Sequence, residues 1–146
     1  MDALAELGTV TARSGIVASA PLGPSRRRYA NAALVLETAL EPPAMLAALQ
    51  RIEDRFGRRR ARRWGERVLD CDIVLWSGGI YSDRHLAIPH PAFRERDFVL
   101  TPARAIAPDW RDPVTGLTVR QLEARLTRAR PLPRAAFAPA AAHGGP

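Results

Sequence analysis

The stretch of sequence at residues 63–75 reads RWGERVLDCDIVL and carries the clearest structural signal in the chain. Its second half, extended to Trp76, consists mainly of apolar and β-branched residues, which predicts a β-strand over residues 68–76. Because successive side chains of a strand point to opposite faces, Asp70 and Asp72 are expected to project together, about 7 Å apart. Cys71 is then expected to face away from both carboxylates.

Two carboxylates on one face repel each other, so a buried or half-buried pair needs a compensating cation. Hard oxygen ligands suit Mg²⁺, and two Mg²⁺ ions about 4 Å apart could bridge Asp70 and Asp72 to the phosphates of a nucleotide. The alternative is a solvated strand face or two salt bridges to arginine. The Asp-x-Asp spacing alone favours that alternative, because exposed carboxylates are commonly solvated or paired without further function.

The segment just before the aspartates is strongly basic. Residues 58–66 contain five arginines together with Trp64 and Gly65 and lack apolar periodicity, which predicts an exposed, mobile loop. Guanidinium groups beside metal-binding carboxylates suit phosphoryl transfer, because they neutralise charge that develops in the transition state. The alternative is a charged surface loop that binds nothing, or that binds RNA without sequence preference.

Length and composition limit the protein class. The chain has 146 residues, 47% of them hydrophobic, which fits one folded domain. All 22 basic residues are arginine and the net charge is +7, which favours an anionic partner, either a nucleotide or a nucleic acid. No apolar run is long enough to cross a membrane and the start is acidic, so a cytoplasmic protein is expected. The lone Cys71 excludes a disulfide scaffold.

Periodicity and turn signals predict the first half of the fold. Residues 2–8 resemble the end of a helix, and residues 9–18 and 29–40 predict two strands around a turn-rich loop. The alanine content of residues 29–40 makes a helix the alternative for the second strand. Apolar residues at helical spacing then predict a helix from Pro42 to Gly57.

The second half reads as short elements and loops. The sequence SGG at residues 77–79 predicts a hairpin turn into a short strand at residues 80–81. Residues 88–91, IPHP, predict a rigid loop, and Pro102 is expected to break the apolar segment at residues 98–106. Residues 117–126 predict a last helix. We therefore expect an α+β domain over residues 1–128, with an antiparallel sheet, and a disordered Pro/Ala-rich tail over residues 129–146.

Three further groups of residues are candidates for a binding site. His90 lies between two prolines, and Arg94 and Arg96 could complete an anion clamp with it. Tyr29 and Phe98 belong to the few aromatic residues of the chain and could hold a planar heterocycle between them. The alternatives are a structural histidine and ordinary core packing of the two aromatic rings.

Residues 63–75, together with residues 21–24, 29–32 and 88–90, closely resemble the 6-hydroxymethyl-7,8-dihydropterin pyrophosphokinase family of folate biosynthesis. The resemblance extends over about residues 4–122 in the family's order and spacing. It implies a ferredoxin-like α+β fold with an antiparallel sheet and flanking helices. It also implies transfer of pyrophosphate from ATP to the pterin hydroxymethyl group, with release of AMP, and no nucleic-acid or membrane partner.

The resemblance implies a role for each matching position. Asp70 and Asp72 match the pair that binds two Mg²⁺ ions, and Arg58 and Arg67 match catalytic arginines of the mobile loop. The positions that match ATP contacts are Gln50, Trp64, Ile73, His90 and Arg96. The positions that match pterin contacts are Leu22, Tyr29, Asn31 and Phe98.

The chain also departs from the family's pattern. Glu66 stands where the family usually has proline, and Pro91 stands where an aromatic residue is common. The family opens with a strand and a Gly-Ser-Asn turn before its first helix, whereas this sequence begins within that helix. We therefore expect a sheet that lacks its first strand and self-association through the exposed gap. The alternative functions are an inactive truncated remnant or a basic RNA-binding domain.

Overall fold

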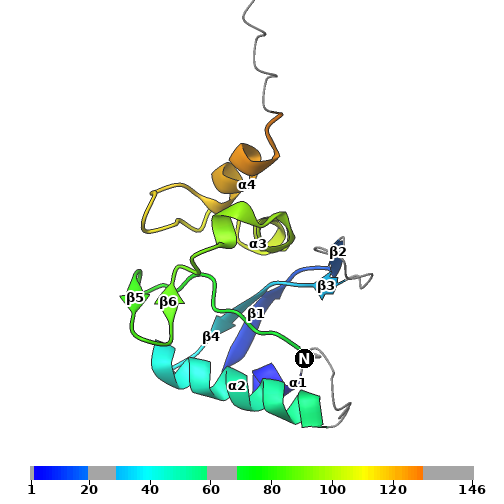
Figure 1. Ribbon diagram of the computed structural model, residues 1–146, viewed down its shortest axis with the longest axis vertical. Helices are drawn as coiled ribbons and strands as arrows, with labels where there is room; N and C mark the ends of the chain where they lie inside the picture. Colours follow the sequence, from blue (N-terminus) through cyan, green and yellow to red (C-terminus); the bar gives the residue numbers. More distant parts are fainter. Residues whose placement is uncertain (1, 20–28, 59–68, 130–146) are drawn as a thin grey trace, which may run out of the picture.

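The computed structural model describes residues 2–19, 29–58 and 69–129, and in residues 19 and 58 only the backbone. The helices and strands follow one another along the chain as shown in Figure 1. They are α1 (Asp2–Ala5), β1 (Thr9–Arg13), β2 (Val17–Ser19), β3 (Tyr29–Asn31), β4 (Leu34–Glu37), α2 (Pro42–Arg58), β5 (Tyr81–Ser82), β6 (Ala87–Ile88), the 3₁₀ turn η1 (Phe93–Glu95), α3 (Asp97–Ile106) and α4 (Val119–Thr127).

The first four strands form one bent antiparallel ribbon. β1 pairs with β4, and β2 pairs with β3. Ser14 connects the two ladders, because its backbone N–H donates to the Ala33 carbonyl at 2.9 Å and its Oγ accepts from the Ala33 N–H at 2.8 Å. The two predicted strands are thus confirmed, each interrupted once, and the helical alternative for residues 29–40 is wrong.

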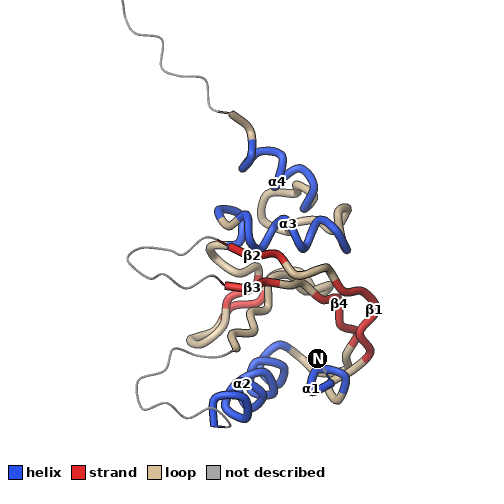
Figure 2. The backbone as a smooth tube through the Cα atoms, turned by 90° about the vertical axis from the view of Figure 1, so that its right-hand side faces the viewer, coloured by secondary structure: helices blue, strands red, loops and turns tan. Residues whose placement is uncertain are grey.

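Helix α2 is the element that the sequence predicts most directly. Pro42 occupies its first turn, where the missing N–H costs no helical hydrogen bond. Four apolar residues at helical spacing are buried, namely Met45, Ala48, Leu49 and Ile52. Figures 1 and 2 show α2 on one side of the ribbon and α3 with α4 on the other.

The strand predicted at residues 68–76 is wrong for the part that the structure describes. Residues 69–76 belong to no strand. The Cys71 N–H donates to Glu53 Oε1 on α2 at 2.7 Å, and the Val74 carbonyl accepts from the His90 N–H at 3.0 Å. Val74 and Leu75 pack against the helical core. An apolar, β-branched sequence favours extended backbone, but a strand also needs a ladder partner.

The hairpin predicted after this segment has a different partner. The Gly79 N–H donates to the Trp76 carbonyl at 3.0 Å, so the turn forms at the expected place. However, β5 pairs antiparallel with β6 and not with the segment before the turn. Ile88, expected in a loop, therefore lies in a strand, and the peptide bond to Pro89 is cis.

The prediction that Pro102 breaks residues 98–106 is also wrong, because α3 continues through it. The ring of Pro102 is buried. The core around α3 consists of Phe93, Leu100, Val119 and Leu122. Burial of this apolar face compensates for the one helical hydrogen bond that a proline cannot make.

Helix α4 confirms the predicted last helix and begins with a capping box. The Thr118 hydroxyl accepts from the Gln121 N–H, and the Gln121 side chain accepts from the Thr118 N–H. Each contact satisfies a backbone donor that has no partner inside the helix. The predicted helix start at Leu117 lies just before this cap.

An ion pair with a buried carboxylate joins the segment before α4 to η1. Arg94 donates through Nε to Asp112 Oδ2 at 2.6 Å and through Nη2 to Asp112 Oδ1 at 2.8 Å. The Asp112 side chain is fully buried. The Arg94 guanidinium lowers the pKa of Asp112 to about 2, and hydrogen bonds from Thr115 and Val114 act in the same direction against the effect of burial.

This lowered pKa predicts a specific loss of stability in acid. A carboxyl group whose pKa is lower in the folded state stabilises the fold above its unfolded pKa and loses this contribution as the pH falls. For Asp112 the loss should occur between pH 3.8 and about pH 2. Asp112→Asn should be less stable at pH 7 and should show a smaller loss over that interval. Urea unfolding at several pH values tests this, and an equal pH dependence in both proteins would contradict it.

The described residues confirm an α+β protein with antiparallel strand pairs flanked by helices. Their strands pair only two by two, so the ferredoxin-like sheet without its first strand stays a prediction. The predicted basic loop lies mostly outside the described residues, as does nearly all of the predicted tail. Among the described helices, none has the length and apolar character needed to span a membrane.

Candidate functional site

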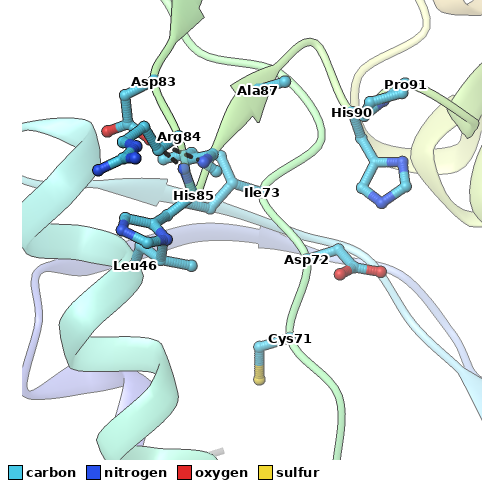
Figure 3. A pocket seen from close by; sticks show the side chains of 11 residues that line it. Leu46, Cys71, Asp72, Ile73, Asp83, Arg84, His85, Ala87, His90 and Pro91 are labelled. Carbon is cyan, nitrogen blue, oxygen red and sulfur yellow. Dashed lines mark hydrogen bonds between the residues drawn. The ribbon is translucent and has the colours of Figure 1, made fainter.

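A cavity of about 390 Å³ opens where α2, residues 71–73 and the β5–β6 hairpin meet (Figure 3). Leu46 contributes from α2, and Asp72 and Ile73 contribute from the extended segment. The hairpin contributes residues 83–87, and His90 and Pro91 complete the lining. The cavity therefore combines apolar side chains with a thiol, two carboxylates, a guanidinium and two imidazoles.

The exposure of residues along the extended segment alternates as expected for an extended backbone, although the segment is not a strand. Asp70 and Asp72 are exposed, whereas Leu69, Cys71 and Ile73 are half-buried. Figure 3 shows the Cys71 thiol and the Asp72 carboxylate pointing in different directions. Burial, followed by the nearby Glu53 carboxylate, raises the pKa of Cys71 to about 11. The thiol is thus neutral at pH 7, and the negative charge here comes from carboxylates.

The donor chemistry of this segment fits Mg²⁺. Asp70 and Asp72 are exposed and carry hard carboxylate oxygens. No group of three metal-ligating side chains gathers within the residues that the structure describes. Magnesium usually keeps several waters and binds through one or two carboxylates plus substrate phosphates. Two exposed aspartates, of which Asp72 lines the cavity, are therefore a suitable protein contribution.

A tight turn places two basic residues at the cavity that the sequence reasoning missed. Asp83 accepts from the backbone N–H groups of His85 and Leu86 at 2.7 and 2.8 Å and from the Tyr81 hydroxyl at 2.7 Å. The Tyr81 hydrogen bond is the main cause that lowers the pKa of Asp83. Arg84 and His85 line the cavity as a result. The sequence feature that could have indicated them is Asp83 followed by the two basic residues, shortly before the segment IPHP at residues 88–91.

His90 is held by two hydrogen bonds, one to the extended segment and one within its own segment. Its backbone N–H donates to the Val74 carbonyl at 3.0 Å, and its Nδ1 accepts from the Ala92 N–H at 3.2 Å. Because Nδ1 accepts, the neutral ring carries its proton on Nε2, which makes Nε2 a donor. Figure 3 shows the rings of His85 and His90 on opposite sides of Ile73. An anionic ligand in the cavity would meet this donor.

The predicted pterin contacts lie on a different pair of elements. Tyr29 and Asn31 belong to β3 and Phe98 belongs to α3, and these two elements are in contact. The Tyr29 side chain is 41% exposed, and Phe98 is half-buried. The Arg96 guanidinium carbon lies 5.6 Å from the centre of the Phe98 ring. The structure thus brings together the two elements that carry the predicted pterin contacts.

Of the remaining predicted residues, only some lie within the described part of the chain. Gln50 is exposed on α2 and is not part of the lining. The side chain of Arg58, at the end of α2, lies outside the described residues, as do Leu22, Trp64 and Arg67. Ile73, His90 and Asp72 are therefore the predicted site residues that line one cavity.

Comparison with known proteins relates this arrangement to a family of enzymes. Residues 1–108 match the family described as 7,8-dihydro-6-hydroxymethylpterin-pyrophosphokinase. The chain is 42% identical over 104 residues to a 2-amino-4-hydroxy-6-hydroxymethyldihydropteridine pyrophosphokinase of Synechocystis sp.. It is 42% identical over 118 residues to the protein of that name from Methylorubrum extorquens, and 46% identical over 97 residues to that from Haemophilus influenzae.

The matched segments cover most of this chain but less of the relatives. They cover 71% of the chain and 53% of the Synechocystis protein. For Methylorubrum extorquens the shares are 80% and 73%, and for Haemophilus influenzae they are 66% and 61%. The chain thus spans about half the length of the first relative and more of the other two.

Proposed function

Because the chain belongs to the 7,8-dihydro-6-hydroxymethylpterin-pyrophosphokinase family, we propose that it transfers pyrophosphate from ATP to 6-hydroxymethyl-7,8-dihydropterin and releases AMP. The hydroxymethyl oxygen forms a bond to the β-phosphorus of ATP. The bond from that phosphorus to the bridging oxygen of the α-phosphate breaks, and AMP leaves with that oxygen. The proton of the hydroxyl group passes to solvent. The product is the pterin diphosphate, an intermediate of folate biosynthesis.

The observation that carries this proposal is the cavity that contains Asp72, Ile73 and His90. Its volume of about 390 Å³ falls within the range of about 300–1,000 Å³ that is typical of small-molecule sites. Leu46, Ile73 and Leu86 supply apolar surface for a nucleotide base, and the hairpin supplies the Arg84 cation and the His85 imidazole. His90 offers a donor to a phosphate oxygen. The cavity therefore suits ATP.

Asp70 and Asp72 are the residues that would hold two Mg²⁺ ions. When bound, the ions neutralise phosphate charge and orient the phosphates for displacement. The protein's contribution is to keep the two carboxylates on one side of an anchored backbone. The Cys71 N–H bond to Glu53 and the Val74 carbonyl bond to His90 hold this segment between α2 and the helical core.

Arginines and a separate pterin site complete the proposed mechanism. Arg58 and Arg67 would neutralise charge on the transferring group. Trp64 would close over the nucleotide, and Gln50 and Arg96 would also contact it. The pterin would lie at β3 and α3, where Tyr29, Asn31 and Phe98 occur, with Leu22 beside it. Contact between β3 and α3 supports this assignment. Positioning and electrostatics supply most of the rate in such a displacement.

The test is direct measurement of AMP. Purified protein should form AMP and the pterin diphosphate in equal amounts from ATP and 6-hydroxymethyl-7,8-dihydropterin. Omission of the pterin, or chelation of Mg²⁺ by EDTA, should stop the reaction. Chromatography of the nucleotides provides the measurement. Absence of AMP together with steeply salt-dependent RNA binding would contradict the proposal and favour a basic RNA-binding domain, and absence of both would favour an inactive remnant.

Three further expectations from the sequence accompany this proposal. The ferredoxin-like arrangement of the sheet is expected from family membership, as is the cytoplasmic location. Self-association through a sheet gap is supported by residues 69–76, which have no ladder partner among the described residues. Sedimentation analysis at several protein concentrations tests the self-association.

A further inference from the structure

The Arg94–Asp112 ion pair has no role in the proposed reaction, yet four hydrogen bonds converge on its buried carboxylate. Asp112 accepts both guanidinium bonds of Arg94, at 2.6 and 2.8 Å. It also accepts from the Thr115 hydroxyl at 2.7 Å and from the Val114 N–H at 3.0 Å. Four donors thus satisfy the two buried oxygens, which offsets the cost of burying a charge.

Asp112 is held rigidly by its own loop. Its backbone N–H donates to the Leu117 carbonyl, and its carbonyl accepts from the Gly116 N–H, both at 2.8 Å. Gly116 has a φ of +72°, a conformation that favours glycine. These two backbone bonds, and the bonds that the Asp112 carboxylate accepts from Thr115 and Val114, close the loop. The loop therefore keeps Asp112 in place without help from Arg94.

Arg94 lies in the middle of η1, between the residues proposed for ATP. Before η1, the His90 carbonyl accepts from the Phe93 N–H at 3.2 Å, and His90 Nδ1 accepts from the Ala92 N–H. After η1, the Arg96 N–H donates to the Phe93 carbonyl at 3.4 Å. These bonds are long, and a 3₁₀ turn is weakly stable by itself. The bidentate contact to Asp112 is therefore a strong external restraint on this turn.

We infer that Arg94 and Asp112 form a positioning pair that fixes η1, and through it the His90 ring and Arg96, for nucleotide binding. The Arg94 guanidinium carbon also lies 4.7 Å from the centre of the Phe93 ring, and Phe93 is fully buried in the helical core. The pair thus attaches η1 to the buried core and to the closed Asp112 loop. This attachment limits the motion of His90, which lines the cavity. This inference rests on the proposed function, since it assigns a role in binding ATP.

Removal of Arg94 should affect binding of ATP more than binding of the pterin. If η1 keeps the competent conformation only part of the time, the apparent dissociation constant for ATP rises in inverse proportion to that fraction. Arg94→Met keeps the apolar stem of the side chain over Phe93 and leaves Asp112 with its two loop donors. We expect about a tenfold higher KM for ATP if the competent fraction falls to about one tenth. The KM for the pterin should rise less than the KM for ATP, because the proposed pterin residues Tyr29 and Asn31 lie on β3 and not next to η1.

Arg94→Lys should give an intermediate KM for ATP, since a lysine keeps the charge but not the bidentate geometry. Arg104→Met provides a matched control in the same helical layer. Arg104 pairs with Glu123 at 3.0 Å between α3 and α4, and Glu123 keeps a hydrogen bond from Thr101 when Arg104 is removed. Arg104→Met should lower the melting temperature without changing the KM for ATP. An equal rise in both methionine variants would overturn the positioning role and indicate general loosening.

Amide hydrogen exchange tests the positioning without any nucleotide. In Arg94→Met, the N–H groups of Ala92 and Phe93 should exchange faster than in the wild type, whereas those of the Asp112 loop should not. Unchanged exchange at Ala92 and Phe93 would overturn the inference while leaving the proposed function intact. The exchange result could be as expected while the wild type fails to bind a non-hydrolysable ATP analogue. That outcome would overturn the proposed function and the assigned role in ATP binding. It would leave the restraint on η1 in place.

Discussion

Asp70→Ala and Asp72→Ala should each reduce Mg²⁺-dependent AMP formation by on the order of 10³-fold or more, because each removes a carboxylate that would hold the metal ions against ATP. Both side chains are exposed, and the segment is anchored through the backbone N–H of Cys71 and the carbonyl of Val74. Alanine removes neither anchor. Stability should therefore stay the same or rise, since removal of one carboxylate also relieves repulsion between the pair.

Rates of AMP formation at several Mg²⁺ concentrations and melting temperatures of the same preparations provide the measurement. Asp54→Ala is a suitable control, because Asp54 is exposed on α2 and is not part of the cavity lining. It should retain wild-type turnover. Near-normal Mg²⁺-dependent turnover in either Asp70→Ala or Asp72→Ala would show that the metal assignment is wrong.

Arg67→Ala should lower kcat by about 100-fold while weakening pterin binding only slightly, because a guanidinium that neutralises the moving phosphates acts mainly in the transition state. Arg67 lies outside the described residues, so the expectation rests on its place five residues before Asp72 and on family membership. Arg67→Lys should recover only part of the rate, because an ammonium group lacks the planar pair of donors.

Single-turnover rates and pterin titrations separate the chemical step from binding. Arg51→Ala is the matched control, since Arg51 is exposed on α2. It should leave both quantities unchanged. A loss of pterin affinity as large as the loss of kcat/KM, with kcat unchanged, would assign Arg67 to ordinary binding.

Some of the structure follows from local sequence alone. Helix α2 needs only its proline start and an apolar stripe at helical spacing, and both are visible in the sequence. The alternation around Cys71 is also local, because extended backbone sends neighbouring side chains to opposite sides whether or not a ladder forms. The alternating exposure of residues 69–73 therefore agrees with the prediction. Family resemblance added the identities of ATP and the pterin, which no spacing or composition could supply.

Other features depend on partners that are distant in the sequence. Whether residues 69–76 form a strand depends on a neighbouring strand, and the hydrogen bonds of this segment go to Glu53 and His90 instead. Pro102 remains in a helix because tertiary packing outweighs its local cost. The Arg94–Asp112 pair joins residues 18 positions apart in the chain.

The sequence by itself determined α2, α4, the two strand segments of the ribbon and the order of the aspartates and His90, because each depends on the period, turn residues or spacing of one short segment. The tertiary structure alone determined that Asp72, Ile73 and His90 share a cavity with Leu46, and that Arg94 meets Asp112. These contacts require several segments to pack at once. Their free energy comes from burial and pairing across the fold, and no local pattern encodes it.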